Sequence, residues 1–82
     1  MASAGSIEGT VLGVMESWPL QLSIESGAQV YHVELTETTR VLRAGREVSP
    51  NSLRPQDLVR VTLSAPGAAP RSFFTERIEI LD

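Results

Sequence analysis

His32 is the only histidine of this 82-residue chain, and it stands two residues before Glu34. Residues two apart on a strand project from the same face, so the pair could supply two ligands to a metal ion. A metal centre needs at least one more ligand, which the surrounding sequence does not supply. We therefore predict no metal site and no cofactor, and we interpret His32 as a solvated side chain beside a carboxylate.

General acid–base catalysis would need paired carboxylates, and the chain offers two pairs, Glu34 with Glu37 and Glu76 with Glu79. Both pairs lie among threonines and arginines that are expected at the surface, which does not favour catalysis. There are no cysteines, which excludes a cysteine nucleophile, a thiolate metal site and disulfide bonds. No serine stands in a nucleophile-elbow context. We therefore predict that the protein is not an enzyme and assign no catalytic residue.

All seven basic residues are arginine, and Arg40, Arg43 and Arg46 lie close enough in sequence to contact an anion. Tyr31 could stack on a base, as aromatic residues do in single-stranded nucleic-acid sites. The net charge of −3 and the pI of about 5.0 oppose phosphate binding. The arginines could equally form a solvated edge that discourages pairing between sheets. We therefore predict single-stranded nucleic-acid binding only as an alternative function.

Trp18 precedes Pro19 in a predicted turn, and Phe73 is out of phase with the last apolar stretch. Together they could form an exposed apolar patch of the kind that marks a protein interface. The alternatives are that Trp18 covers one end of a barrel and that Tyr31, in phase with Val33, is a core residue. We predict a binding or structural module with a protein partner, as a monomer or weak dimer. The interaction candidates are Trp18, Tyr31, Arg40, Arg43, Arg46 and Phe73.

These residues must be positioned mainly by strands, because apolar residues alternate with polar ones along most of the chain. The first two stretches lead into hairpin turns, and Ser26-Gly27 closes the second. Gly9 and Gly13 indicate a bulge, a bend or a close backbone approach in the first strand. The predicted strands are Ile7–Met15, Leu20–Glu25, Gln29–Thr36, Leu58–Leu63 and Ser72–Leu81.

The middle of the chain is predicted to be less regular. Thr36–Thr39 is expected to be a polar connection, followed by a short extended segment over Arg40–Arg43 and brief pairing of Glu47–Val48. Ser49 before Pro50 is typical of a helix N-cap, so one helical turn is expected there. Leu53 would then fill one end of a barrel.

Two local patterns refine the later strands. Pro55 sets the corner of a turn that Asp57 can close with its carboxylate. In the last strand Phe74, Ile78 and Ile80 are expected to face inward, with a bulge near Thr75 or Glu76.

The order of these elements predicts an all-β fold, a five- to six-stranded small antiparallel barrel. It is OB-like, with an SH3-like barrel as the alternative, and has one short helical turn before the fourth main strand. Residues 1–6 are expected to be a disordered N-terminus and residues 7–82 a single domain. No apolar run is long enough to span a membrane, and no targeting signal is visible. The expected compartment is the cytoplasm as the chain stands, or the envelope or exterior if it is a piece of a longer protein.

Four segments carry a resemblance that covers roughly residues 7–81: Gly9-Thr10-Val11, residues 39–45, residues 53–61 and residues 76–80. They resemble a bacterial domain-of-unknown-function family of small barrels, whose pattern reads Leu-x-x-Gly-Asp-x-Val-x-Val. The resemblance implies an exported or envelope-associated barrel and brings no catalytic residue. Gln56 stands where the pattern has Gly, so we expect a turn here that needs no positive φ.

Overall fold

The computed structural model describes residues 5–15, 20–67 and 71–81. Trp18 lies outside these ranges, so its expected roles as a cover or an interface stay predictions. No helix in the described part is long and apolar enough to cross a membrane. The elements are β1 (Ser6–Met15), β2 (Gln21–Ser26), β3 (Gln29–Arg43), β4 (Arg46–Val48), a 3₁₀ turn (Pro50–Ser52), β5 (Leu58–Pro66) and β6 (Ser72–Ile80). β1 thus begins at Ser6, inside the segment expected to be disordered.

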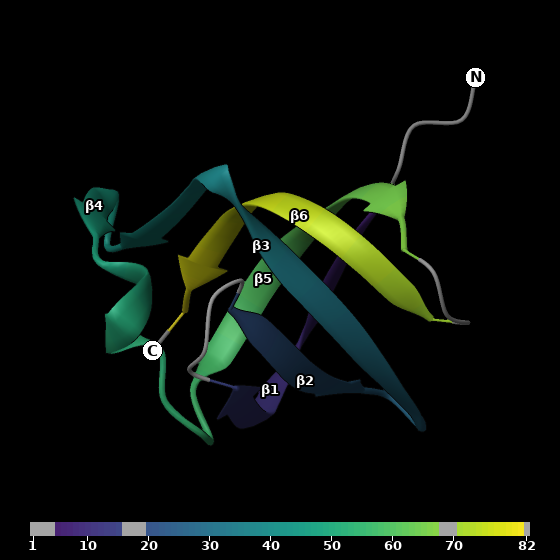
Figure 1. Cartoon of the computed structure of the whole chain (residues 1–82). Coiled ribbons are helices and arrows are strands. Elements are labelled where there is room, and N and C mark those ends of the chain that lie inside the picture. Colours follow the sequence, from purple (N-terminus) through teal and green to yellow (C-terminus); the bar gives the residue numbers. More distant parts are fainter. Residues whose placement is uncertain (1–4, 16–19, 68–70, 82) are drawn as a thin grey trace.

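Five of the strands close into a barrel (Figure 1). The sheet order is β2-β1-β5-β6-β3-β4, and pairing of β2 with β3 joins the sheet to itself. β6 lies between β5, to which it is antiparallel, and β3, to which it is parallel. This Greek-key order is that of an OB-like barrel, which confirms the predicted fold class and favours OB-like over SH3-like. The one parallel pair was not expected.

The core follows the predicted alternation along the strands. Val59, Val61 and Leu63 of β5 are buried, whereas Arg60 between them is exposed. Apolar residues at every second position of β2 and β3 fill the same interior. The buried apolar side chains are Val11, Leu20, Leu22, Ile24, Val33, Leu35, Val41, Leu53, Val59, Val61, Leu63, Ile78 and Ile80.

The two glycines of β1, Gly9 and Gly13, have different structural roles. A Cβ atom at Gly9 would clash with the backbone carbonyl of Glu25 on β2, so only glycine permits this close approach. Gly13 lies at a bulge where the β1–β2 register shifts after Val11, and a Cβ there would have no neighbouring atom within 4 Å. The predicted bulge and close approach are both confirmed.

The predicted polar connection at Thr36–Thr39 is wrong, because β3 runs through it without a break. The β3–β6 register shifts between Leu35 and Arg40, and the threonines satisfy the backbone at this irregularity. The Thr36 amide donates to Thr39 Oγ1 over 2.7 Å, and Thr39 Oγ1 donates to the Thr75 carbonyl over 2.6 Å. Threonine hydroxyls therefore take the place of the missing hydrogen bonds between the strands. For this reason the polar composition of the segment does not indicate a loop.

β6 contains the predicted bulge. Thr62 pairs with Arg77 and Leu63 with Thr75, so Glu76 is the extra residue. The bulge changes which side chains before it face the core. Phe73 packs on the core, and Thr75 is fully buried. The expectation that Phe74 faces inward is therefore wrong. Ile78 and Ile80, beyond the bulge, are buried as predicted.

The turn before β5 is closed as predicted, because Asp57 Oδ2 accepts a hydrogen bond from the Arg54 amide over 2.9 Å. The expectation that the turn avoids positive φ is wrong. Gln56 has a φ of 78°, which matches the third position of a type II turn with Pro55 at the second. Gln56 therefore adopts the conformation for which the family pattern uses glycine.

The segment before this turn closes one end of the barrel. Ser49 Oγ accepts from the Asn51 amide over 3.1 Å, so Ser49 caps the 3₁₀ turn as predicted. Leu53 is buried behind it. β4 pairs with the end of β3, which confirms the brief pairing at Glu47–Val48. In Figure 1, β3 runs across the molecule from the β2–β3 hairpin to β4.

Candidate functional site

The outer face of β1, β2 and β3 presents three rows of side chains that run across the strands. The middle row contains Gly13, Ser23, His32 and Ser72, which are cross-strand neighbours from β1 to β6. The row on one side contains Thr10, Glu25 and Val30, and the row on the other contains Met15, Gln21, Glu34 and Phe74. Three of the four side chains in the middle row are small, so this row forms a valley across the sheet, in which the exposed side chain of His32 stands.

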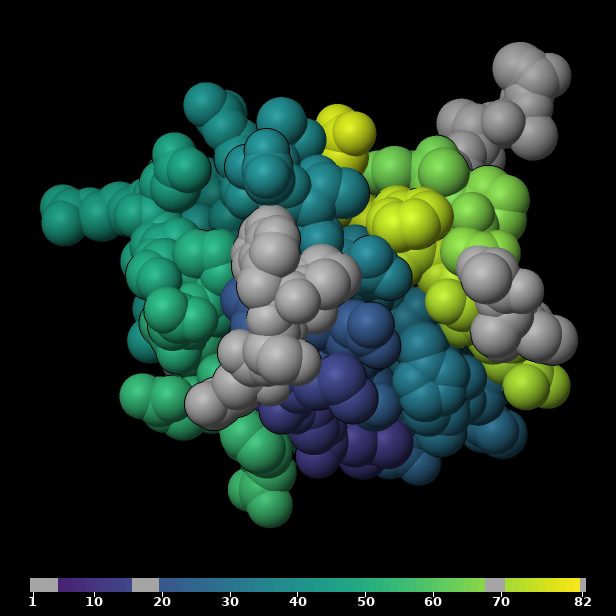
Figure 2. Space-filling model, in the orientation of Figure 1, coloured from purple at the N-terminus to yellow at the C-terminus, as the bar shows by residue number. Residues whose placement is uncertain are grey.

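The β1–β2–β3 part of this valley is an open hollow of about 510 Å³. It passes over Gly13, whose missing side chain leaves space between Met15 and Ser23. Met15 is 56% exposed and supplies an apolar wall. In Figure 2 the end of β1 (purple), β2 (blue) and the first half of β3 (blue-teal) form one continuous surface. We call this hollow the outer groove.

His32 lies at the middle of the valley. Its Nδ1 atom is 3.4 Å from Ser23 Oγ on β2, within hydrogen-bond distance. This contact engages Nδ1 and leaves Nε2 without a partner among the described residues. The register places Gln21, Ser23, Glu25, His32 and Glu34 on the same face of the sheet.

A second hollow of about 320 Å³ continues from His32 toward the start of β6. Ala28, Gln29, Val30, His32 and Arg71 line it. The His32 amide donates to the Arg71 carbonyl over 2.9 Å, so the backbone sets the position of the two residues relative to each other. Within the described ranges the Arg71 guanidinium has no hydrogen bond or ion pair. We call this hollow the Arg71 pocket.

The two aromatic candidates, Tyr31 and Phe73, lie together rather than on the outer groove. Their ring centroids are 6.2 Å apart, and the ring planes are tilted by 40°. Both rings are half-buried, and Phe73 packs on the core. This pair therefore resembles the core-and-rim alternative considered for Tyr31 more than a base-stacking platform.

The three candidate arginines do not share one face. Arg43 and Arg46 are cross-strand partners on β3 and β4, whereas Arg40 lies three positions before Arg43 and so projects from the opposite face. Arg40 is the cross-strand neighbour of Arg77 on β6. An anion on either face would meet at most two of the three candidates.

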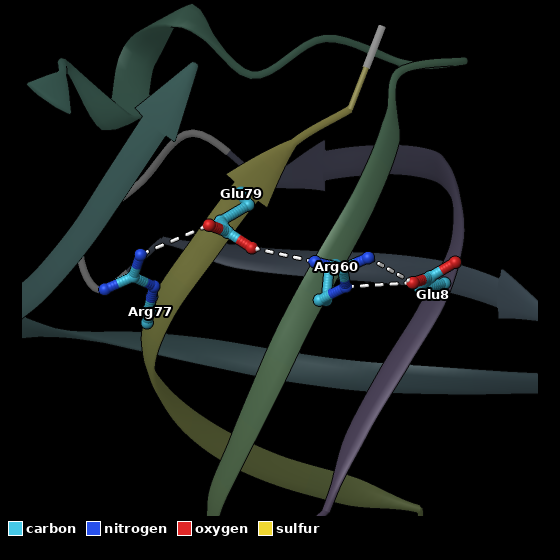
Figure 3. A network of polar contacts seen from close by, with 4 residues as sticks. All are labelled: Glu8, Arg60, Arg77 and Glu79. Atoms are coloured by element: carbon cyan, nitrogen blue, oxygen red, sulfur yellow. Dashed lines mark hydrogen bonds and ion pairs between the residues drawn. The ribbon is translucent and has the colours of Figure 1, made fainter. Parts of the chain in front are cut away.

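A row of charges crosses β1, β5 and β6 on another side of the barrel (Figure 3). Arg60 lies between Glu8, at 2.7 Å, and Glu79, at 3.3 Å. Arg77 contacts the other oxygen of Glu79 at 3.2 Å. The hydrogen bond from Arg77 lowers the pKa of Glu79, and hydrogen bonding to Glu8 raises that of Arg60. Glu79 is thus held as a carboxylate, which suits an ion pair better than a general acid.

The described residues contain no group of three or more histidine, cysteine, aspartate or glutamate side chains that could hold a metal ion. His32 and Glu34 remain two ligands without a third. We found no family model, no curated protein and no solved structure that matches this chain. The site must therefore be interpreted from its own geometry.

Sequence reasoning found the exposed face but missed two residues that shape it. Gly13 was interpreted only as a backbone feature, although its missing side chain opens the groove. Arg71 is not among the interaction candidates that the sequence suggests. Its position beside His32 depends on the parallel β3–β6 pairing, for which a single sequence carries no local signal.

Proposed function

We propose that this protein is a non-enzymatic binding module that holds an extended, basic peptide segment of a protein partner in the outer groove. The observation that carries the proposal is the hollow over Gly13 and Ser23, with Glu25 in the row on one side and Glu34 in the row on the other. Lysine or arginine side chains of an extended peptide could reach these carboxylates, while its backbone meets Ser23 and His32.

The dimensions of the valley fit a short peptide. Neighbouring strands lie about 4.8 Å apart, so a valley across four strands spans about 14 Å. An extended peptide advances about 3.3 Å per residue, so about four or five residues would fill it. Binding over so small an area is expected to be weak, with a Kd of about 10⁻⁴ to 10⁻³ M.

Single-stranded nucleic acid is the second candidate, since OB-like barrels use this face for it. The same carboxylates would repel phosphate, and Tyr31 lies with Phe73 rather than in the groove. The arginine candidates lie on β3 and β4, away from the residues that line the groove. These observations favour the peptide.

A titration followed by amide NMR distinguishes the two. The isotope-labelled domain is mixed with a peptide of about six alternating lysines and serines, with a glutamate–serine peptide, and with a thymidine oligonucleotide of similar length. We expect shifts at Gly13, Ser23 and His32 with the lysine peptide only. No shifts at millimolar lysine peptide would overturn the proposal, and stronger shifts with the oligonucleotide would establish the nucleic-acid function instead.

A groove-filling variant gives the matched control. Because Gly13 has open space around it and no positive φ, Gly13→Leu should fold normally while its side chain fills the groove. Gly5→Leu adds the same side chain at a glycine that also has open space but lies outside the groove. Binding should be lost in the first variant and kept in the second.

A further inference from the structure

We infer that the Arg71 pocket is an anion subsite that takes the C-terminal carboxylate of the bound peptide. This inference rests on the proposed function and adds to it a direction of binding and a defined end for the ligand. The partner segment would be the C-terminal tail of a protein, with basic residues before its last position.

The first observation is the charge of the pocket. Arg71 and His32 both line it, and no carboxylate of the described residues does, whereas Glu25 and Glu34 lie in the rows beside the valley and line neither hollow. The valley therefore changes character along its length. Glu25 on β2 and Glu34 on β3 flank its β2–β3 part, and its β3–β6 end has a guanidinium and an imidazole. A peptide with basic side chains and a free carboxylate has the complementary distribution of charge.

The second observation is that Arg71 is available. Each of the arginines on the β5–β6 surface, Arg60 and Arg77, is engaged by a glutamate. No carboxylate in the described ranges engages the Arg71 guanidinium, although the residue is fixed by its backbone hydrogen bond with His32. A guanidinium presents parallel N–H donors that match the two oxygens of a carboxylate.

The third observation is the mixture of donors around the pocket. Gln29 adds a side-chain amide, and His32 adds the ring nitrogen that Ser23 does not contact. The pocket also has an apolar side at Val30, which is 40% exposed. A terminal residue could place its carboxylate on Arg71 and its side chain against Val30.

The test compares the lysine–serine peptide as a free acid and as a C-terminal amide, both with acetylated N-termini. Wild-type protein should bind the acid about five- to tenfold more tightly than the amide. In Arg71→Gln, which keeps a long polar side chain at the same backbone φ, the two peptides should bind equally. Arg46→Gln, an exposed arginine on β4, should keep the preference for the acid.

A smaller ligand tests the Arg71 pocket independently of the outer groove. N-acetylglycine should shift the Arg71 side-chain N–H and the amides of Val30 and His32, whereas N-acetylglycinamide should not. Peptides that bind equally as acid and amide to the wild type would overturn this inference and leave the proposed function intact. Shifts with N-acetylglycine but no binding of any lysine peptide would support the anion subsite and overturn the proposed function. If N-acetylglycine causes no shifts and no lysine peptide binds, the proposed function and the anion subsite are both overturned.

Discussion

The backbone amide of Gln56 donates a hydrogen bond of 2.7 Å to the carbonyl of Val11, at the point where β1 is bulged. The Val11 amide returns a bond of 2.9 Å to the carbonyl of Asp57. The turn before β5 is therefore paired with β1, and the positive φ of Gln56 is what directs its amide there. A residue with an unfavourable conformation holds two distant parts of the barrel together.

Substitution Gln56→Gly should stabilise the protein by about 0.5 to 1 kcal/mol. A residue with a side chain is destabilised by about 1 to 2 kcal/mol in the left-handed region, and glycine is not. Glycine also raises the conformational entropy of the unfolded chain, which offsets part of this gain in stability. Urea unfolding at neutral pH should show a higher midpoint with an unchanged slope. The control Gln56→Ala keeps the unfavourable φ and should give no gain. An equal gain from alanine would contradict the explanation.

The two glycines of β1 should respond in opposite ways to alanine. Gly9→Ala should cost about 1 to 3 kcal/mol or more, because the new methyl group meets the Glu25 carbonyl and the strands must move apart. Gly13→Ala should be neutral or stabilising by up to about 1 kcal/mol, since it meets nothing and restricts the unfolded chain. Thermal unfolding of both variants checks this. Similar losses at the two positions would show that the close approach at Gly9 does not decide the residue.

The β3–β4 hairpin should accept a better turn residue. Ala44 and Gly45 have φ values of 53° and 80°, which is the pattern of a type I′ turn. Asparagine tolerates this conformation better than alanine, so Ala44→Asn should raise the free energy of unfolding by about 0.5 kcal/mol. Gly45→Ala should lower it by about 1 kcal/mol. Urea unfolding measures both, and a loss of stability in Ala44→Asn would contradict the turn assignment.

The charged row on β1, β5 and β6 should make stability depend on pH in the acid range. Hydrogen bonding from Arg77 lowers the pKa of Glu79 below its ordinary 4.5 in the folded state. Its stabilising contribution is therefore complete above that ordinary pKa and is lost as the pH falls through the lowered one. Glu79→Gln should be less stable than wild type at neutral pH, and the difference should disappear in acid.

The matched control for this pH dependence is Glu47→Gln on β4, an exposed glutamate outside the charged row. Its unfolding curves, measured over the same pH series, should follow those of wild type. If the difference between Glu79→Gln and wild type persisted at the lowest pH, it would arise from packing and not from ionisation of the carboxylate.

Much of the fold could be predicted because the strands carry local signals. The alternation in Val59, Val61 and Leu63, the cap at Ser49 and the turn-closing carboxylate of Asp57 all depend on neighbours in sequence. The errors occur where distant partners decide the conformation. Thr36–Thr39 stays extended because hydroxyls bond to the backbone of β3 itself and, from Thr39, of β6.

The candidate site was less predictable than the fold for the same reason. The exposed face with Ser23 and His32 follows from alternation within single strands. The valley exists only when the rows of β1, β2, β3 and β6 are aligned, and this alignment includes a one-residue bulge at Leu12, between Val11 and Gly13. A shift of one residue in register would have placed Leu12 or Val14 in that row.

The parallel pairing of β3 with β6 has a consequence for how the chain folds. β6 is the last described strand to leave the ribosome, yet its place is between β5 and β3. Until it inserts, both neighbours present rows of unpaired N–H and C=O groups, which are templates for aggregation. A chain that lacks Ser72–Ile80 would therefore expose an open slot with two complementary edges. The same slot could receive the missing strand as a separate peptide, so this barrel is suited to reassembly from two fragments.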